Sequence, residues 1–201
     1  IDVDSPMNVE PMRAARGRDG HAARMRVMDV AVRRDSAGWE LYLSHHVFRL
    51  EDLCYGVRLS RIRLDPQFAS ARAGEEWESV FETDPCVPYL QGERREPFFR
   101  GNDSGGRLAW LEPDVILLTV GEHLLPGLAP NPSSDFGKTI RIDLGAGGSP
   151  ARHYTVGHRN PQGLAVVGDV VWATEHGPQG GDELNRLVDG GDYGWDRVSW
   201  G

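Results

Sequence analysis

The sequence has few of the features that mark membrane-spanning, nucleic-acid-binding or disulfide-rich proteins. No apolar run approaches the roughly 18 residues that a membrane span needs. The net charge is −8 and no basic cluster is present, which argues against a nucleic-acid surface. The only two cysteines, Cys54 and Cys86, do not decide the redox compartment, and whether they pair stays open. What remains is an acidic chain of 201 residues, long enough for one domain with a hydrophobic core.

Glycine and proline dominate the local pattern instead. The 25 glycines and 13 prolines leave little room for long helices. Short apolar or alternating runs between turn signals are typical of β-strands. Residues 1–23 are polar, arginine-rich and without periodicity, which predicts an irregular segment. The strands expected after it are 27–32, 39–46, 57–64, 77–81, 106–110, 115–123, 138–143, 164–167 and 170–174.

A strand pair with the same pattern occurs three times. Its first strand is represented by 29–32, 107–110 and 163–166, and its second strand runs toward His46, His123 and His176. A repeated hairpin with unequal spacers predicts an all-β fold of the β-propeller type, whose blades are four-stranded sheets of roughly 40 to 50 residues. In a propeller the three polar tails would converge on one channel mouth. A double-sheet sandwich also explains short strands, but not why a tail ending in histidine recurs.

The last hairpin carries the densest cluster of polar residues. Its strands are separated by Gly168-Asp169, a two-residue turn signal, so they should pair antiparallel. Arg159, Asn160 and Gln162 would therefore face residues 175–178 across one rim. A guanidinium and two amides beside a glycine-opened backbone suggest a site for an anionic or carbonyl-rich ligand. The ordinary alternative is a polar loop pair that closes a hairpin.

These motifs closely resemble the signature of the quinoprotein sugar dehydrogenases, the soluble aldose and glucose/sorbosone dehydrogenase family. The matching segments read GHRNPQG at 157–163, EHGP at 175–178, GDE at 181–183 and YGW at 193–195. The resemblance implies a six-bladed β-propeller. Residues 24–201 would form about three to four of its blades, so we expect the chain to be a fragment, consistent with its lack of an initiator methionine.

The resemblance also implies two cofactors, pyrroloquinoline quinone and Ca²⁺, at the channel mouth. The positions that match quinone-contacting residues are Arg159, Asn160, Gln162 and His123. The backbone carbonyls of Gly177 and Pro178 would ligate calcium, a hard cation that prefers oxygen ligands. Glu183 and the backbone of Tyr193 match a second, structural calcium site of some relatives. Their ordinary alternatives are a solvated strand residue and a packed turn.

The expected catalytic base departs from the family pattern. Relatives carry a histidine four residues before the arginine of a Gly-Gly-Arg-Leu segment, and here Asp103 holds that position. A carboxylate can act as a general base, although an ordinary carboxylate is weaker than imidazole. The resemblance implies oxidation of the C1 hydroxyl of an aldose-type sugar, with Asp103 and Arg159 as catalytic residues. A non-catalytic quinone- or carbohydrate-binding propeller is the alternative, and a hydrolytic, lactonase-type propeller ranks last.

The expected partners follow from the same resemblance. They are a small sugar substrate and a soluble electron acceptor, with no nucleic acid and no membrane span. Open sheet edges at both ends of a partial propeller leave room for a homodimer. The family implies a periplasmic or secreted location.

Overall fold

A computed structural model of the chain describes residues 6–10, 12, 25–35, 38–67, 70–71, 74–91, 96–97, 101–145 and 151–198. Most of the segment predicted to be irregular, residues 1–23, therefore lies outside the described residues. Two described positions within it pack against the first sheet. The Asn8 side chain exchanges two hydrogen bonds with the backbone of Phe48, and Met12 is buried in the hydrophobic core. This part of the segment belongs to the packed structure.

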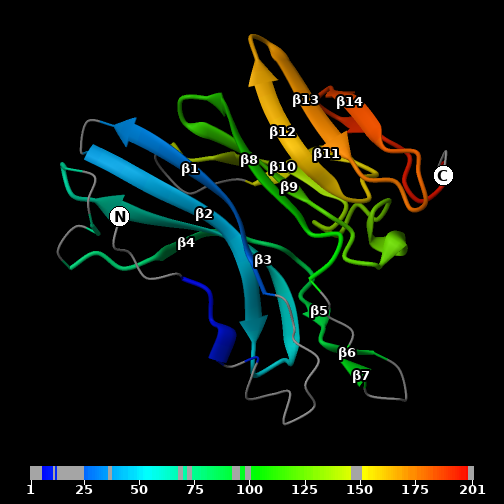
Figure 1. The fold of residues 1–201 in the computed structure, drawn as a ribbon, viewed down its shortest axis with the longest axis horizontal. Coiled ribbons are helices and arrows are strands. Elements are labelled where there is room, and N and C mark those ends of the chain that lie inside the picture. Colours follow the sequence, from blue (N-terminus) through cyan, green and yellow to red (C-terminus); the bar gives the residue numbers. More distant parts are fainter. Residues whose placement is uncertain are drawn as a thin grey trace.

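The described residues form three larger sheets and one short hairpin (Figure 1). The first sheet contains β1 (Val27–Asp35), β2 (Gly38–Arg49), β3 (Cys54–Leu64), β4 (Glu78–Glu82) and β5 (Val87–Pro88). The second contains β8 (Gly105–Glu112), β9 (Val115–Val120), β10 (Lys138–Asp143), β11 (Arg152–Val156) and β15 (Gly191–Asp192). The third contains β12 (Pro161–Val167), β13 (Val170–Glu175) and β14 (Glu183–Leu187). The two-stranded hairpin is β6 (Leu90–Gln91) with β7 (Glu96–Pro97), and the 3₁₀-helix η1 covers Pro126–Leu128.

Every strand expected from the sequence overlaps an observed strand, although several boundaries differ. The sequence did not reveal β11 or β14, whose sequences RHYTV and ELNRL mix polar and apolar residues over only five positions. Such short segments carry little periodicity of their own. Their neighbours hold them in place, because β11 pairs with β10 and β14 pairs with β13.

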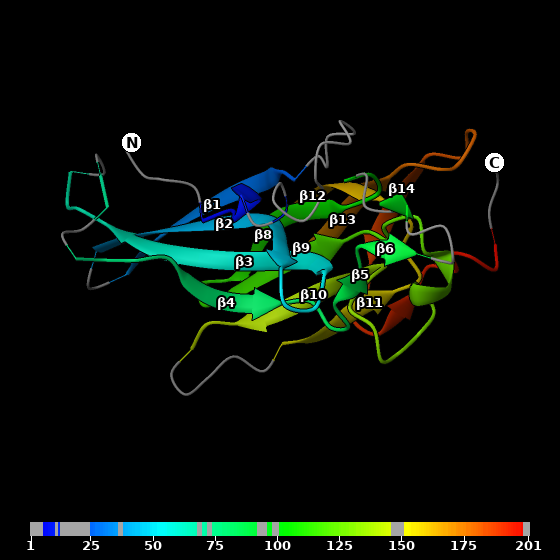
Figure 2. The ribbon, with the colours of Figure 1, turned by 90° about the horizontal axis from the view of Figure 1, so that it is seen from below.

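The first strands of the three larger sheets, β1, β8 and β12, lie beside one another. Figure 2 shows the strands of the first two sheets succeeding one another in the same direction, from β1 to β4 and from β8 to β10. The backbone N–H of Leu108 donates to Asp29 across β8 and β1 at 2.9 Å. The Thr119 hydroxyl donates to the Pro161 carbonyl at 3.0 Å, which links β9 to β12. Meandering sheets joined through their first strands are the arrangement of propeller blades.

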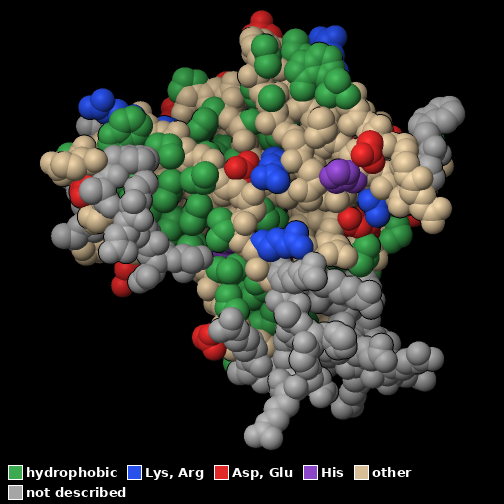
Figure 3. Space-filling model, in the orientation of Figure 1, with side chains coloured by type: hydrophobic (Ala, Val, Ile, Leu, Met, Phe, Trp, Pro, Cys, Tyr) green, Lys and Arg blue, Asp and Glu red, His purple; other side chains and the backbone are tan. Residues whose placement is uncertain are grey.

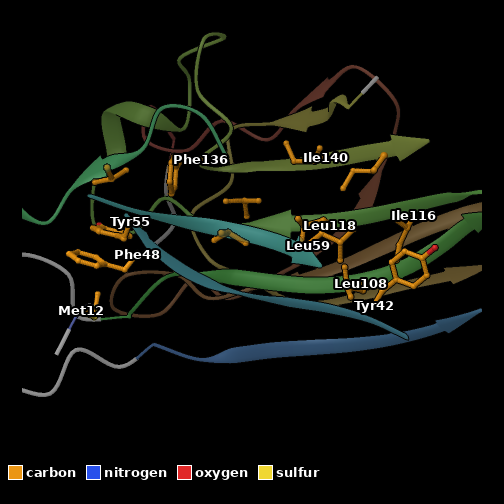
Figure 4. Packing of buried hydrophobic residues seen from close by; sticks show 14 of the residues in the cluster. Met12, Tyr42, Phe48, Tyr55, Leu59, Leu108, Ile116, Leu118, Phe136 and Ile140 are labelled. Carbon is orange, nitrogen blue, oxygen red and sulfur yellow. The ribbon is translucent and has the colours of Figure 1, made fainter. Parts of the chain in front are cut away.

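The hydrophobic core lies between successive sheets. The largest cluster joins the first and second sheets, and Figure 4 shows Tyr55 and Phe48 near Phe136, with Leu59 and Leu118 further along the strands. A smaller cluster joins the second and third sheets. Burial of these side chains stabilises the side-by-side arrangement of the first strands. Each Å² of apolar surface removed from water contributes about 25 cal/mol to the free energy of folding.

The pairing of the two cysteines, which the sequence left open, is settled by the structure. Cys54 and Cys86 form a disulfide with a Cα–Cα distance of 5.6 Å. It ties the start of β3 to the loop that precedes β5. Among the described residues, no helix has the length and apolar character to cross a membrane.

Candidate functional site

The hairpin of β12 and β13 brings the GHRNPQG segment against the EHGP segment. Pro161 pairs with Glu175, so the residues just before β12 and just after β13 share one rim. The Arg159 guanidinium donates through Nη1 to the carbonyl oxygens of His176 and Gly177, at 3.1 and 3.2 Å. Its backbone N–H donates to the Glu175 carboxylate at 2.9 Å. Figure 3 shows basic, acidic and histidine side chains close together at the surface where the third sheet ends.

Arg159 also reaches the second sheet. Its Nη2 donates to Oδ2 of Asp103 at 3.1 Å, and both side chains are largely buried. The guanidinium carbon lies 5.5 Å from the ring centroid of Trp195, within the range of a cation–π contact. Asp103 stands in the loop before β8 with φ +46°, a left-handed conformation that few residues other than glycine adopt. The Arg159 guanidinium therefore contacts both Asp103, the expected base, and the carbonyl of Gly177, an expected calcium ligand.

A small cavity lies beside Arg159. Its volume is about 20 Å³, enough for one water molecule or one ion and too small for a three-ring quinone. Its lining includes all four residues expected to bind calcium, Gly177, Pro178, Glu183 and Tyr193. The resemblance divided these residues between two separate calcium sites. In this structure they border a single cavity.

The oxygen atoms at this cavity suit a hard cation. The carbonyls of His176 and Gly177 already face a positive charge, because the Arg159 guanidinium contacts both. Carbonyl and carboxylate oxygens are the ligands that Ca²⁺ prefers. Among the described residues, no three side chains of histidine, cysteine, aspartate or glutamate gather as a metal-binding cluster. Any cation held here would therefore depend mainly on backbone oxygens, with Glu175 and Glu183 as the carboxylates of the cavity wall.

Asn160 and Gln162 turn toward the neighbouring sheet rather than into the cavity. The Asn160 side-chain oxygen accepts hydrogen bonds from Gln162 Nε2 at 2.7 Å and from the Gly105 N–H at 3.4 Å. Arg107, in the Gly-Gly-Arg-Leu segment, donates to the Gln162 carbonyl at 2.7 Å and to the Met28 carbonyl at 2.9 Å. Arg107 thus joins the first strands of all three larger sheets, a role that the sequence did not reveal.

Replacing Arg107 by lysine should destabilise the protein by about 3 kcal/mol, because a single ammonium cannot reach carbonyls on both neighbouring sheets and would leave one of them unpaired. Chemical denaturation of the full-length protein measures the loss. The matched control is Arg141→Lys, which changes a partly buried arginine of β10 paired with Glu112. Equal stability of the two variants would contradict the role assigned to Arg107.

Two of the three histidines of the repeated tails, His46 and His123, pack against each other with ring centroids 5.6 Å apart. Convergence of the three polar tails on one channel mouth stays a prediction. His123 is 3% exposed and packs among the rings of His46, Tyr55 and Phe136. Burial lowers the pKa of His123 to about 3, which keeps the imidazole neutral. His176 instead lies at the surface, 3.4 Å from Asp182. The expected contact between His123 and a quinone stays a prediction, since its ring does not line the cavity beside Arg159.

Two buried carboxyls near Arg159 were not singled out from the sequence. Glu175 accepts the Arg159 N–H and lies 3.5 Å from His158. Glu122 is 2% exposed, and its own backbone N–H donates to the Arg159 carbonyl at 2.8 Å. Burial, followed by the nearby Asp103 charge, raises the pKa of Glu122 to about 7. A glutamate in a polar tail gives no sequence signal of burial, which depends on the packing between sheets.

The raised pKa of Glu122 makes stability depend on pH. A carboxyl whose pKa is higher in the folded state favours folding below its unfolded value and loses that contribution as pH rises through about 7. Glu122→Gln keeps the site neutral and should raise the free energy of unfolding at pH 8 by up to about 3 kcal/mol. At pH 4.5 the variant and the parent should differ little. Denaturation curves at the two pH values test this, and an equal difference at both would contradict it.

The fold and the rim define a β-propeller whose polar site lies near the ends of adjacent first strands. The chain belongs to the glucose/sorbosone dehydrogenase family, because the sequence profile of that family, Glucose / Sorbosone dehydrogenase, matches residues 22–201. The resemblance seen in the sequence is thereby confirmed.

Named relatives and a solved structure agree with this assignment. The chain is 34% identical over 114 residues to the aldose sugar dehydrogenase YliI of Escherichia coli (strain K12), covering 50% of this chain and 31% of that protein. It is 40% identical over 73 residues to quinoprotein glucose dehydrogenase B of Acinetobacter calcoaceticus, covering 31% and 15%. A glucose dehydrogenase crystal structure superposes with a TM-score of 0.70 at 27% identity, covering 86% of this chain and 50% of that one. The chain thus spans at most half the length of these proteins.

Proposed function

We propose that the full-length protein is a quinoprotein oxidoreductase that oxidises the C1 hydroxyl of an aldose-type sugar, with pyrroloquinoline quinone and Ca²⁺ as cofactors. The observation that carries the proposal is the set of contacts made by Arg159, which joins Asp103 to the carbonyls of His176 and Gly177. Relatives named aldose sugar dehydrogenase and quinoprotein glucose dehydrogenase support the reaction class.

The residues proposed to hold the cofactors surround Arg159. The carbonyls of Gly177 and Pro178 would ligate calcium, and Glu183 and Tyr193 border the same cavity. Arg159 would have to release the Gly177 oxygen before that oxygen could bind a metal. The residues proposed to contact the quinone are Arg159, Asn160, Gln162 and His123. The small volume of the cavity is consistent with an ion, so the quinone would lie outside it.

In the proposed chemistry the C1–H bond of the sugar breaks with its electron pair, and the hydroxyl proton leaves separately. The bound quinone would supply the hydride acceptor. Asp103 would take the hydroxyl proton on a carboxylate oxygen. Arg159 would stabilise negative charge that develops next to it, as a fixed cation whose position is set before the reaction. Trp195 packs over the same guanidinium and would limit its movement.

A dye-reduction assay tests the proposal. Full-length protein is given calcium and quinone, and sugar-dependent bleaching of a soluble electron-acceptor dye is measured across a panel of aldoses. We expect bleaching with at least one aldose and none when quinone is omitted. Absence of bleaching across the panel, in protein that binds quinone, would reject the dehydrogenase function.

A quinone- or carbohydrate-binding propeller without turnover is the second candidate function. It is favoured by one observation, the salt bridge that engages the Asp103 carboxylate with Arg159. A carboxylate held by a guanidinium gives up a favourable charge interaction when it accepts a proton. Tight quinone binding without sugar oxidation would support this candidate.

The remaining partners and the location are proposed from the reaction class and the disulfide. A small sugar, a soluble electron acceptor and a periplasmic or secreted location follow from the reaction class. The Cys54–Cys86 disulfide supports export, because disulfides persist in oxidising compartments. A homodimer remains a proposal that size measurement of the full-length protein would test.

A further inference from the structure

A buried histidine of the first sheet, His46, contacts the loop that carries the proposed base. It lies in β2 and is 0% exposed. Its Nε2 is 3.0 Å from Oγ of Ser104, the residue after Asp103. Ser104 is also buried, and its hydroxyl donates to the Asn102 carbonyl at 3.3 Å. Through this one serine, the imidazole is linked to the residues on both sides of Asp103.

The hydrogen bonds of the His46 ring fix the position of its proton. Its Nδ1 accepts the backbone N–H of Arg26 at 3.0 Å, and a nitrogen that accepts carries no proton. Burial, followed by the neighbouring His123, lowers the pKa of His46 well below its usual value, so the ring is neutral. A neutral imidazole then bears its proton on Nε2, which donates to Ser104.

The loop needs firm support because the backbone of Asp103 is strained. Asp103 has φ +46°, a left-handed conformation that persists where the surrounding structure holds it. The tail after β9 supplies part of this support. The Gly121 N–H donates to the Ser104 carbonyl and the His123 N–H donates to the Asp103 carbonyl, each at 3.0 Å.

Strand β2 supplies further support from the first sheet. Side chains two positions apart in a strand point to the same face, so Ser44 and His46 both face the loop. The Ser44 hydroxyl donates to the Gly106 carbonyl at 2.5 Å, and His46 donates to Ser104. The two contacts hold the loop on either side of Gly105. The position of Asp103 is therefore coupled to side chains of a different sheet.

We propose that His46 is a positioning residue for sugar oxidation, whose neutral imidazole holds Asp103 in place through Ser104. This inference rests on the proposed function. A general base has to lie within hydrogen-bond reach of the hydroxyl it deprotonates, and a displacement of about 1 Å can cost roughly 10²-fold in rate. Alignment of the base affects the transition state more than sugar binding, so loss of His46 should lower kcat and change KM little.

Two substitutions separate the Ser104 contact of His46 from its Arg26 contact. An asparagine amide reaches about as far as imidazole Nδ1, and a glutamine amide reaches about as far as Nε2. His46→Asn therefore keeps an acceptor for Arg26 and loses the bond to Ser104, whereas His46→Gln keeps a donor for Ser104.

The matched control is His45→Asn. His45 is equally buried, and its Nε2 lies 2.8 Å from Oγ of Ser60 on β3. Its Nδ1 lies 2.8 Å from the His46 carbonyl, a contact that an asparagine amide keeps. The control thus removes a histidine–serine contact of the same kind on the opposite face of β2, away from Asp103.

The first test needs neither quinone nor sugar. Amide hydrogen exchange of the full-length protein is followed by NMR at the amides of Gly121 and His123, which donate to the loop that carries Asp103. His46→Asn should accelerate exchange at both amides by up to about tenfold, the effect of losing one hydrogen bond that holds the loop. The Tyr193 amide, which donates to the Val156 carbonyl, reports global stability and should exchange at the parent rate.

The other two variants decide how this result is read. His46→Gln and His45→Asn should both leave the Gly121 and His123 amides near the parent exchange rate. Equal acceleration in His45→Asn and His46→Asn would overturn the inference, and so would unchanged exchange in His46→Asn.

The second test measures turnover. His46→Asn should lower kcat for aldose oxidation by about tenfold with KM little changed, and His46→Gln should recover most of that loss. Ser104→Ala removes the same contact from its other side, and it serves as the test variant if His46→Asn does not fold. The double variant should lose little more than either single variant, because both act through one contact. Additive losses would overturn the inference.

The two experiments separate failure of the positioning role from failure of the proposed function. If the parent protein oxidises no aldose, the proposed dehydrogenase function fails and the role of His46 in catalysis falls with it. Hydrogen exchange then still decides whether His46 holds the loop. An active parent whose kcat is unchanged in His46→Asn would overturn the positioning role and leave the dehydrogenase function standing.

Discussion

Replacing Arg159 by leucine should lower kcat/KM for sugar oxidation by about 10³-fold, the upper range seen when one preorganised charge-stabilising donor is removed. Arg159 contacts Asp103 and two carbonyls of the rim, and it packs on Trp195. Its loss removes the positive charge and the only described side chain that joins Asp103 to the Gly177 carbonyl. Steady-state kinetics on the full-length protein, loaded with calcium and quinone, measures the change.

Two further variants sharpen the Arg159 prediction. Arg159→Lys keeps the charge but cannot contact the carbonyls and Asp103 together, so it should recover only part of the lost rate. Arg152→Leu removes an exposed arginine paired with Asp189 and serves as the matched control, which should stay near the parent rate. If Arg159→Leu loses no more activity than Arg152→Leu, Arg159 has no catalytic role.

The sequence was sufficient to predict the hairpins and their equivalence. Alternating runs such as 57–64 and the Gly168-Asp169 turn encode strand and turn locally, so period and turn chemistry reveal them. Antiparallel geometry alone predicted that Arg159 and Gly177 lie at the same rim, because Arg159 precedes one strand of a hairpin and Gly177 follows the other. Repetition of the hairpin then predicted the propeller, which the likeness to a solved glucose dehydrogenase confirms.

The sequence could not predict contacts that depend on how the sheets meet. Arg107 was recognised only as part of a motif, whereas its carbonyl partners, Gln162 and Met28, lie 55 and 79 positions away in sequence. His123 was expected to line the cofactor pocket, and its burial by packing between the first two sheets could not be read from the sequence. The burial of Glu122 could not be predicted from the sequence either, because it also depends on packing between sheets. Burial and charge neighbours are properties of the assembled sheets, and local pattern does not contain them.

Replacing Asp103 by asparagine should lower kcat by between about 10²- and 10⁴-fold, the range attributed to a general base, with KM nearly unchanged. Asp103→His should exceed the parent by about tenfold, because imidazole has an ordinary pKa of about 6.5 and is better matched to neutral pH. The matched control is Asp114→Asn, an exposed carboxyl paired with Arg33. A gain with histidine would mean that the rim assembles a working cofactor site whose base limits the rate. Equal rates for the asparagine variant and the parent would exclude Asp103 as the base.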